Sequence, residues 1–486
     1  MFDIHFESTR CLLCHEAPCT AACPKDGVDP ARGLRAIRFE NDHCEGLFFN
    51  SATCASCDAP CEKACVHHDF PIRIREVAKT LEAPSGLADA VRSGSLPSLE
   101  IEFCGVKCEN PFFIGSAVVS SGYDMIAKAF RMGWAGVVYK TVTFSEIKEV
   151  SPRFDQVGKE GTPFIGFRNM EQLSVRTPEE DFAIMARLKR DFPTKVVVAS
   201  IMGNDESEWS RLAVMAQEAG CDMVECNFSC PHMAAKGRGS DVGQNPELVK
   251  HLTGVVKAAV SIPVIAKMTP NITHIEEPSI AAVEGGADGI AAINTIKSIT
   301  MKRRSEVRGK ATVSGYSGKA VKPIAQRFIL DIRKDGMLKD IPLSGIGGVE
   351  TWRDAIQYIV LGCNNVQVVT AVMQYGYRVI DDIILGIQDW MVRKGHKSLE
   401  DVRGTALDKF VGTDQLDRDS KVLPVFDRQR CVGCGRCYIS CNDGGHQAIS
   451  FDSSERIPHL IGRNCVGCHL CLLVCQAGAI SAGKRF

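Results

Sequence analysis

Two cysteine runs near the C-terminal end of this 486-residue chain carry its strongest chemical signal. Each run has the spacing C-x2-C-x2-C-x3-C, with Cys431, Cys434, Cys437 and Cys441 in the first and Cys465, Cys468, Cys471 and Cys475 in the second. Thiolates at this spacing hold a cubane iron–sulfur cluster, and in two-cluster ferredoxins the fourth cysteine of each run binds the other cluster. We therefore predict one [4Fe-4S] cluster on Cys431, Cys434, Cys437 and Cys475, and another on Cys465, Cys468, Cys471 and Cys441. Zinc is the alternative, but three cysteines crowded into such a short segment suit a cubane better.

The N-terminal end carries a second pair of cysteine runs with a different spacing. They comprise Cys11, Cys14, Cys19 and Cys23, then Cys54, Cys57, Cys61 and Cys65, and both runs contain an Ala-Pro-Cys core. These cysteines suffice for two further cubanes, and a helical stretch over 30–39 joins the two halves. A disulfide framework is disfavoured because residues 1–10 contain no apolar signal sequence. Zinc binding stays open as an alternative.

The composition argues against several classes of partner. The formal net charge is −1 and there is no basic block, so nothing indicates binding to nucleic acid or to a membrane surface. No apolar run approaches the ~18 residues that a membrane-spanning helix needs. Oxygen-sensitive clusters and many free thiols predict a cytoplasmic protein.

Between the cysteine-rich ends, short β-branched strands alternate with helices. The expected strands are 112–116, 136–140, 196–202, 223–228, 264–268, 289–294, 343–347 and 366–370. Eight strand-then-helix units in about 300 residues predict an α/β fold, a closed (β/α)8 barrel, with a doubly wound open sheet as the alternative. We therefore divide the chain into a helical iron–sulfur domain (1–95), the barrel (99–395), a linker (396–424) and a ferredoxin-like domain (425–486).

Polar residues at the C-terminal ends of these strands favour the barrel, because barrel enzymes build their active sites at that rim. They are Ser116, Lys140, Asn227, Lys267, Asn294 and the pair Gly347-Gly348. The glycine pair after the seventh strand and Thr370 after the eighth suit a phosphate group. Lys140 and Lys267 could place positive charge over a flavin ring. These features predict FMN, which converts between one-electron clusters and two-electron organic chemistry.

Residues suited to a ring substrate gather at the same rim. Asn169, Asn227 and Asn294 each offer a donor and an acceptor, which matches a cyclic amide or imide. Cys230 follows the fourth expected strand, where a thiol can give or take a proton, although it could instead be a simple turn cysteine before proline. The next loop, 233–243, has the composition of either a mobile lid or an ordinary surface loop.

Several stretches resemble the dihydropyrimidine dehydrogenase family, especially its bacterial pyrimidine-reducing subunits. They are YKT (139–141), SPR (151–153), NME (169–171), ASIM (199–202), NFSCP (227–231), AKMTPN (266–271), INT (293–295) and CVGCGRCY (431–438). The resemblance implies an FMN barrel, related to dihydroorotate dehydrogenases, that reduces the C5=C6 bond of uracil or thymine. In that chemistry a hydride passes from flavin N5 to C6, and a cysteine thiol protonates C5.

The resemblance also implies roles for individual residues. Cys230 would be the acid. The pyrimidine would be held by Asn169, Glu171, Asn227, Asn294 and Thr295. FMN would be held by Ser116, Lys140, Thr141, Lys267, Gly318, Gly347, Gly348 and Thr370.

The N-terminal region resembles the helical two-cluster domain of the full-length enzyme of this family, but it departs at one ligand. In the family a glutamine from a later helix completes one cluster, whereas residues 71–81 here contain no glutamine and Cys54 is an additional cysteine. We therefore expect one cluster on Cys23, Cys54, Cys57 and Cys61, and another on Cys11, Cys14, Cys19 and Cys65. The chain would then carry four [4Fe-4S] clusters.

The expected electron donor is a separate protein. No G-x-G-x-x-G motif follows a strand, so a dinucleotide-binding fold is not indicated. We expect an FAD- and NAD(P)H-binding flavoprotein subunit, or a ferredoxin, to feed the N-terminal clusters, then the C-terminal clusters, FMN and the pyrimidine. The resemblance implies a homodimer or heterotetramer.

Two alternative functions stay open. One is an FMN enzyme that acts on another planar ring such as orotate, although no rim arginine is obvious to bind a carboxylate. The other is a non-catalytic electron-transfer subunit whose barrel only supports the clusters.

Overall fold

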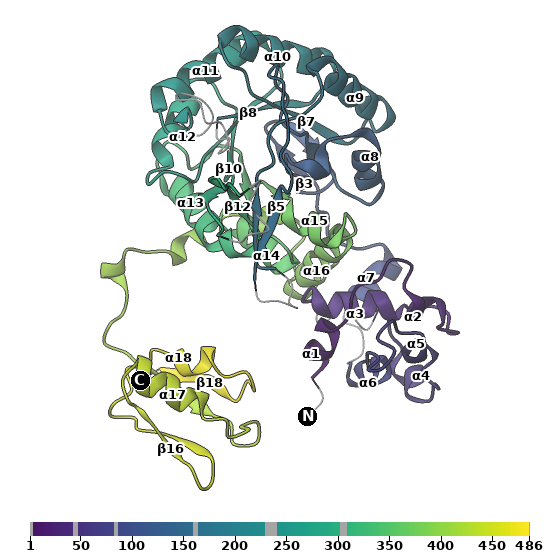
Figure 1. Cartoon of the computed structure of the whole chain (residues 1–486), viewed down its shortest axis with the longest axis vertical. Helices are drawn as coiled ribbons and strands as arrows, with labels where there is room; N and C mark the ends of the chain where they lie inside the picture. The colour runs from purple at the N-terminus through teal and green to yellow at the C-terminus, as the bar shows by residue number, and fades with distance from the viewer. Residues whose placement is uncertain are drawn as a thin grey trace. The chain divides into compact units, whose positions relative to one another are not determined.

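The computed structural model describes residues 3–41, 47–81, 86–158, 164–228, 241–301 and 309–485 (Figure 1). The chain forms two compact units, Met1–Leu407 and Asp408–Phe486. In the first unit, the described residues before the barrel form seven α-helices; the second unit contains the C-terminal cysteine runs. Across the described residues, no helix combines the length and the apolar character needed to cross a membrane.

Eight parallel strands close into a barrel at the centre of the first unit. They are β3 (Phe112–Ile114), β4 (Gly136–Val138), β7 (Val196–Ile201), β8 (Met223–Asn227), β9 (Val264–Lys267), β10 (Gly289–Ala292), β13 (Leu343–Ile346) and β14 (Asn365–Val368). Each strand pairs with the next along the chain, and β14 pairs with β3, with Val366 opposite Phe112. The predicted closed (β/α)8 barrel is confirmed, and the open sheet is excluded.

The barrel strands are buried on both faces, which explains their unbroken apolar runs. All six residues of β7 are buried, for example. The outer ring is formed by α8 (Tyr123–Arg131), α9 (Pro178–Asp191), α10 (Glu206–Glu218), α11 (Pro246–Ala259), α12 (Glu276–Glu284), α13 (Lys322–Lys334), α14 (Trp352–Val360) and α16 (Val379–Lys394). Their starts follow local rules: at α9, Thr177 and Glu180 form a capping box, with Pro178 at the first helical position between them. One additional short helix, α15 (Thr370–Tyr375), begins where the eighth strand was expected to end.

An antiparallel sheet and a hairpin accompany the barrel, and the sequence did not indicate either. The sheet has the order β11 (Ile296–Ser298), β12 (Ser314–Ser317), β6 (Gly166–Asn169), β5 (Phe154–Val157), and the hairpin joins β1 (Ile101–Phe103) to β2 (Val106–Cys108). Asn169, expected in a loop, is the last residue of β6 and lies opposite Gly315. The neighbouring Arg168 is buried and donates from Nε to Ser314 Oγ at 2.6 Å. The sheet therefore fixes Asn169 through contacts with a distant part of the chain.

The N-terminal helices share a small core of their own. They are α1 (Ile4–Thr9), α2 (Pro18–Ala21), α3 (Pro30–Arg38), α4 (Ser51–Ala55), α5 (Pro60–Lys63), α6 (Ile74–Thr80) and α7 (Gly86–Ser93). Leu34, Ile37, Phe49 and Val77 pack together with Cys61 and other cysteines in this core. The repeated Ala-Pro-Cys segments both become helix starts with proline at the first position, in α2 and α5.

These helices contact the barrel through α14 and α16. Arg35 Nε lies 2.7 Å from Asp382 Oδ2, and Asn41 Nδ2 donates to the Asp382 carbonyl at 3.1 Å. Trp352 Nε1 donates to the carbonyl of Glu40 at 2.8 Å. Burial raises the pKa of Asp382 to about 7, an effect that Arg35 opposes.

This contact predicts a pH-dependent stability. Because the folded state holds the Asp382 proton more tightly than the unfolded chain, the free energy of unfolding should fall as pH rises from about 4 to about 7. The fall should amount to a few kcal/mol and should flatten above pH 7. Urea unfolding measured between pH 5 and 8 gives the free energy of unfolding at each pH. In Asp382→Asn this free energy should depend less steeply on pH than in the wild type. The neighbouring Asp381→Asn, whose side chain is 37% exposed, is the matched control; equal slopes in all three proteins would contradict the assignment.

The second unit is a small two-fold repeat. β15 (Val422–Phe426) pairs with β18 (Ile480–Arg485), β16 (Ile449–Asp452) pairs with β17 (Ile457–Leu460), and both pairs are antiparallel. The short helices α17 (Arg436–Gly444) and α18 (Leu470–Leu473) each start inside a cysteine run. Cys437, Ile449 and Cys471 form the shared core. This is the ferredoxin-like arrangement that the cysteine spacing predicts.

Candidate active site and cluster-binding cysteines

A cavity of about 1210 Å³, counting its open mouth, lies at the C-terminal rim of the barrel. Every described residue that the sequence analysis assigned to FMN or to the pyrimidine lines it: Ser116, Lys140, Thr141, Asn169, Glu171, Asn227, Lys267, Asn294, Thr295, Gly318, Gly347, Gly348 and Thr370. Cys230 lies outside the described residues, as does most of the loop 233–243. The structure thus brings the two predicted sets of residues into one space.

One end of the cavity is a glycine-lined cradle. Gly318, Gly347 and Gly348 all have positive φ, at 94°, 139° and 68°. A Cβ on Gly348 would lie 2.9 Å from the Gly318 carbonyl oxygen and 3.0 Å from Lys322 N, so the close approach requires glycine. Such a cradle fits a phosphate group. The residues at this end of the cavity are therefore compatible with the phosphate of the predicted FMN. Burial raises the pKa of Glu350 at this end, and the nearby Lys319 opposes that effect.

Lys267 is paired with an acid that the sequence analysis did not single out. Its Nζ lies 3.4 Å from Oε1 of Glu225, which is only 1% exposed. Gln367 Nε2 donates to the other oxygen of Glu225 at 3.3 Å and to Ser344 Oγ at 3.1 Å. Within the described part of the chain Gln367 Oε1 accepts no hydrogen bond, and the residue lines the cavity, so this oxygen can accept from a bound ring. The sequence did offer a signal for Glu225 and Gln367, because each is a charged or amide residue inside a buried barrel strand.

The amide side chains at the rim are oriented by a continuous chain of hydrogen bonds. Asn294 Nδ2 donates to Asn227 Oδ1 at 3.2 Å, and Asn227 Nδ2 donates to Thr141 Oγ1 at 2.9 Å. Thr141 Oγ1 lies 2.9 Å from Ser200 Oγ and 3.3 Å from Ser116 Oγ. These contacts fix where the donor nitrogen and the acceptor oxygen of each amide side chain lie, as recognition of a cyclic amide requires.

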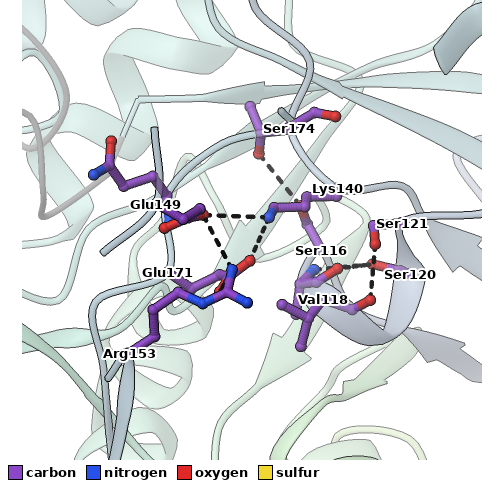
Figure 2. Close-up of polar contacts among 12 residues, drawn as sticks. Ser116, Val118, Ser120, Ser121, Lys140, Glu149, Arg153, Glu171 and Ser174 are labelled. Atoms are coloured by element: carbon purple, nitrogen blue, oxygen red, sulfur yellow. Dashed lines mark hydrogen bonds and ion pairs between the residues drawn. The ribbon is translucent and has the colours of Figure 1, made fainter. Parts of the chain in front are cut away.

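Four charged residues form a network at the side of the cavity (Figure 2). Lys140 Nζ pairs with Glu171 Oε1 and lies 3.6 Å from Glu149 Oε1. Arg153 Nη1 lies 3.0 Å from Glu171 Oε2 and 3.7 Å from Glu149 Oε1. The expectation that no arginine stands near the rim is therefore corrected. Arg153 is close to the site, but its charge is already paired with the carboxylates of Glu149 and Glu171.

Four of the N-terminal cysteines lie around one small cavity, and the division of all eight into two ligand groups stays a prediction. Cys23, Cys54, Cys57 and Cys61 line one small cavity, beside Phe49 and Ile74. In the other group, burial raises the pKa of Cys19 to about 11, and the charges of Cys11 and Cys65 add to the effect. Burial also raises the pKa of the Cys11 thiol, with contributions from Cys14 and Cys65.

The C-terminal cysteines show the crossed arrangement expected of two-cluster ferredoxins. Cys431, Cys434, Cys437 and Cys475 line one cavity, and Cys441, Cys465, Cys468 and Cys471 line another. The backbone also reaches the sulfur atoms: Ala448 N donates to Cys441 Sγ and Ala479 N to Cys475 Sγ, both at 3.3 Å. Hydrogen bonds to cluster sulfur tune the reduction potential.

Comparison with known proteins agrees with this architecture. The family model for dihydroorotate dehydrogenase matches residues 98–391, and a 4Fe-4S dicluster domain model matches residues 425–481. The NAD-dependent dihydropyrimidine dehydrogenase subunit PreA of Escherichia coli (strain K12) is 52% identical over 367 residues, covering 74% of this chain and 89% of that protein. The chloroplastic dihydropyrimidine dehydrogenase (NADP(+)) of Arabidopsis thaliana is 38% identical over 70% of this chain and 84% of that protein. The catalytic subunit of dihydroorotate dehydrogenase B (NAD(+)) of Pyrococcus horikoshii is 36% identical over 64% of this chain and 98% of that protein.

The barrel, its cavity and the dicluster domain define an iron–sulfur flavoprotein oxidoreductase of the kind that acts on CH–CH bonds. Within that class, the chain belongs to the dihydropyrimidine dehydrogenase family. The resemblance seen in the sequence is thereby confirmed.

Proposed function

We propose that this chain reduces the C5=C6 bond of uracil or thymine to the 5,6-dihydropyrimidine, in a reversible reaction. The observation that carries the proposal is the single cavity that combines a glycine cradle, two lysines and a hydrogen-bonded set of amides. The cradle and lysines suit FMN, and the amides suit the alternating N–H and C=O groups of a pyrimidine. The names of the relatives that are 52% and 38% identical add independent support.

In this proposal FMN, when bound, supplies the hydride that C6 receives. Cys230 gives its thiol proton to C5, so that the hydride and the proton together saturate the double bond. Asn169, Asn227, Asn294 and Thr295 hold the ring and fix which edge faces each donor. Glu171 accepts a hydrogen bond from a ring N–H. Ser116, Thr141, Gly318, Gly347, Gly348 and Thr370 hold FMN, with Lys140 and Lys267 supplying positive charge.

Electrons would reach the site through four [4Fe-4S] clusters, two in residues 1–95 and two in residues 425–486; in the sequence the barrel (99–395) and the linker (396–424) lie between these two regions. The donor would be a separate FAD- and NAD(P)H-binding flavoprotein subunit or a ferredoxin, in a homodimer or heterotetramer in the cytoplasm. One relative is named as a subunit of an NAD-dependent enzyme, which supports a division of labour between chains.

A second candidate is a dihydroorotate-type substrate. The relative named as a dihydroorotate dehydrogenase B catalytic subunit aligns over nearly its whole length, and Arg153 stands near the cavity. Against it, Glu149 and Glu171 balance the charge of Arg153 and Lys140, so the network offers no surplus positive charge for a substrate carboxylate.

The test is an anaerobic spectrum of the dithionite-reduced protein, freed of excess reductant, before and after uracil is added. We expect rapid return of flavin and cluster absorbance together with formation of dihydrouracil, whereas orotate should have no such effect. NADH added to the isolated chain with uracil should not be consumed. Reoxidation by orotate alone would favour the second candidate, and no reoxidation by uracil, thymine or orotate would reject the proposal.

A further inference from the structure

Two members of the charged network stand behind the cavity wall. Lys140 and Glu171 line the cavity, whereas Glu149 and Arg153 contact them without lining it. Figure 2 shows the Arg153 guanidinium reaching toward both carboxylates and the Lys140 amine pointing at the same pair. Any role of Glu149 and Arg153 in the site must therefore act through Lys140 and Glu171.

Glu149 contacts both the segment that carries Lys140 and the segment that carries Glu171. Its Oε1 accepts a hydrogen bond at 3.0 Å from the backbone N–H of Gln172, the residue that follows Glu171. The same oxygen lies 3.6 Å from Lys140 Nζ. The Arg153 carbonyl accepts from Met170 N at 2.9 Å on the other side of Glu171. The segment 149–153 thus binds the backbone N–H of both neighbours of Glu171, through the Glu149 side chain and the Arg153 carbonyl, and Arg153 pairs with the Glu171 side chain.

The network is balanced and mostly buried. Side-chain exposure is 8% for Lys140, 9% for Glu171 and 12% for Glu149, so solvent screens these three charges little. Arg153 is 36% exposed, so its charge is screened more. Two cations and two carboxylates sum to zero, which buried charges require. Glu171 Oε2 accepts no hydrogen bond from the described residues, although Arg153 Nη1 lies 3.0 Å away. This oxygen keeps a lone pair for a donor on a ligand.

We propose that Glu149 and Arg153 are positioning residues that set both the orientation of Glu171 toward the pyrimidine and the charge that Lys140 presents to FMN. The inference rests on the proposed function. It has a consequence that simple structural support would not have: neutralising Glu149 leaves a surplus positive charge beside Lys140, whereas neutralising Arg153 leaves a surplus negative charge. Because reduction adds negative charge to the flavin, the two changes must move its potential in opposite directions.

The experiment compares FMN-loaded Glu149→Gln and Arg153→Gln with the wild type. The matched control is Glu146→Gln on the same loop, because Glu146 is 79% exposed and pairs with Lys148 at 3.0 Å. Anaerobic redox titration should give a higher flavin potential in Glu149→Gln, a lower one in Arg153→Gln, and no change in the control. The Kd of uracil for the oxidised protein should rise about tenfold or more in both variants, the effect of one charge-assisted hydrogen bond.

Flavin potentials that move in the same direction, or that stay with the control, would overturn the inference. If Arg153→Gln fails to fold, Arg153→Lys keeps the charge without the planar fork; it should restore the wild-type potential but not the wild-type uracil Kd. A wild type that binds neither uracil nor thymine would reject the proposed function instead, and opposite potential shifts in the same experiment would still support the control of Lys140 by its neighbours.

Discussion

Uracil reduction by a Cys230→Ala variant is expected to be roughly 100- to 10,000-fold slower than by the wild type. The reason is that C5 must receive a proton as C6 receives the hydride, and alanine offers none. FMN content and the Kd of uracil should stay within about twofold of the wild type, because the cavity residues that bind both groups are unchanged. Stopped-flow reoxidation of the reduced protein by uracil measures the rate directly.

Cys226→Ala is the matched control for this prediction. Cys226 lies four positions earlier, on β8, and is fully buried in the barrel core. Its loss should cost a little stability but leave the reoxidation rate unchanged. A Cys230→Ala variant that reoxidises at the wild-type rate would remove the thiol from the mechanism and direct attention to another acid in the cavity.

Replacing Cys54 by alanine should remove one cluster, about a quarter of the iron under the four-cluster proposal. Cys54 shares its cavity with Cys23, Cys57 and Cys61, and the chain offers no glutamine in residues 71–81 to take its place. Electron delivery from an external donor should therefore fail, whereas the protein reduced directly with dithionite should still convert uracil. Iron analysis and low-temperature EPR of the reduced protein provide the measurements.

Cys44→Ala is the control for Cys54, because Cys44 belongs to neither predicted ligand group. It should keep the full iron content. Full iron and an unaltered spectrum in Cys54→Ala itself would show that the cluster takes its fourth ligand elsewhere. The division of the N-terminal cysteines into two groups would then need revision.

Much of the site followed from local sequence because parallel strands share a direction. Ser116, Lys140, Asn227, Lys267 and Asn294 stand at the C-terminal ends of five different barrel strands, so closing the barrel necessarily brings them to one rim. The cysteine runs are local in the same sense: their spacing alone indicates a cluster. The bounds of α9, α10, α11 and α13 were also predictable, since proline, capping residues and apolar periodicity all act within a few turns.

Other parts of the site depended on contacts that no local pattern records. Glu225 and Gln367 are 142 residues apart, and Arg168 and Ser314 are 146 apart, so only closure of the barrel and pairing of β6 with β12 bring them together. The sequence analysis gave Glu149 and Arg153 no role in the site, and only the fold places them against Lys140 and Glu171. Residue type and spacing are enough to identify the groups that can do chemistry, because they fix thiolate, amide and lysine chemistry. Which charges are buried together depends on the folded chain, since burial and pairing are properties of segments that meet in space.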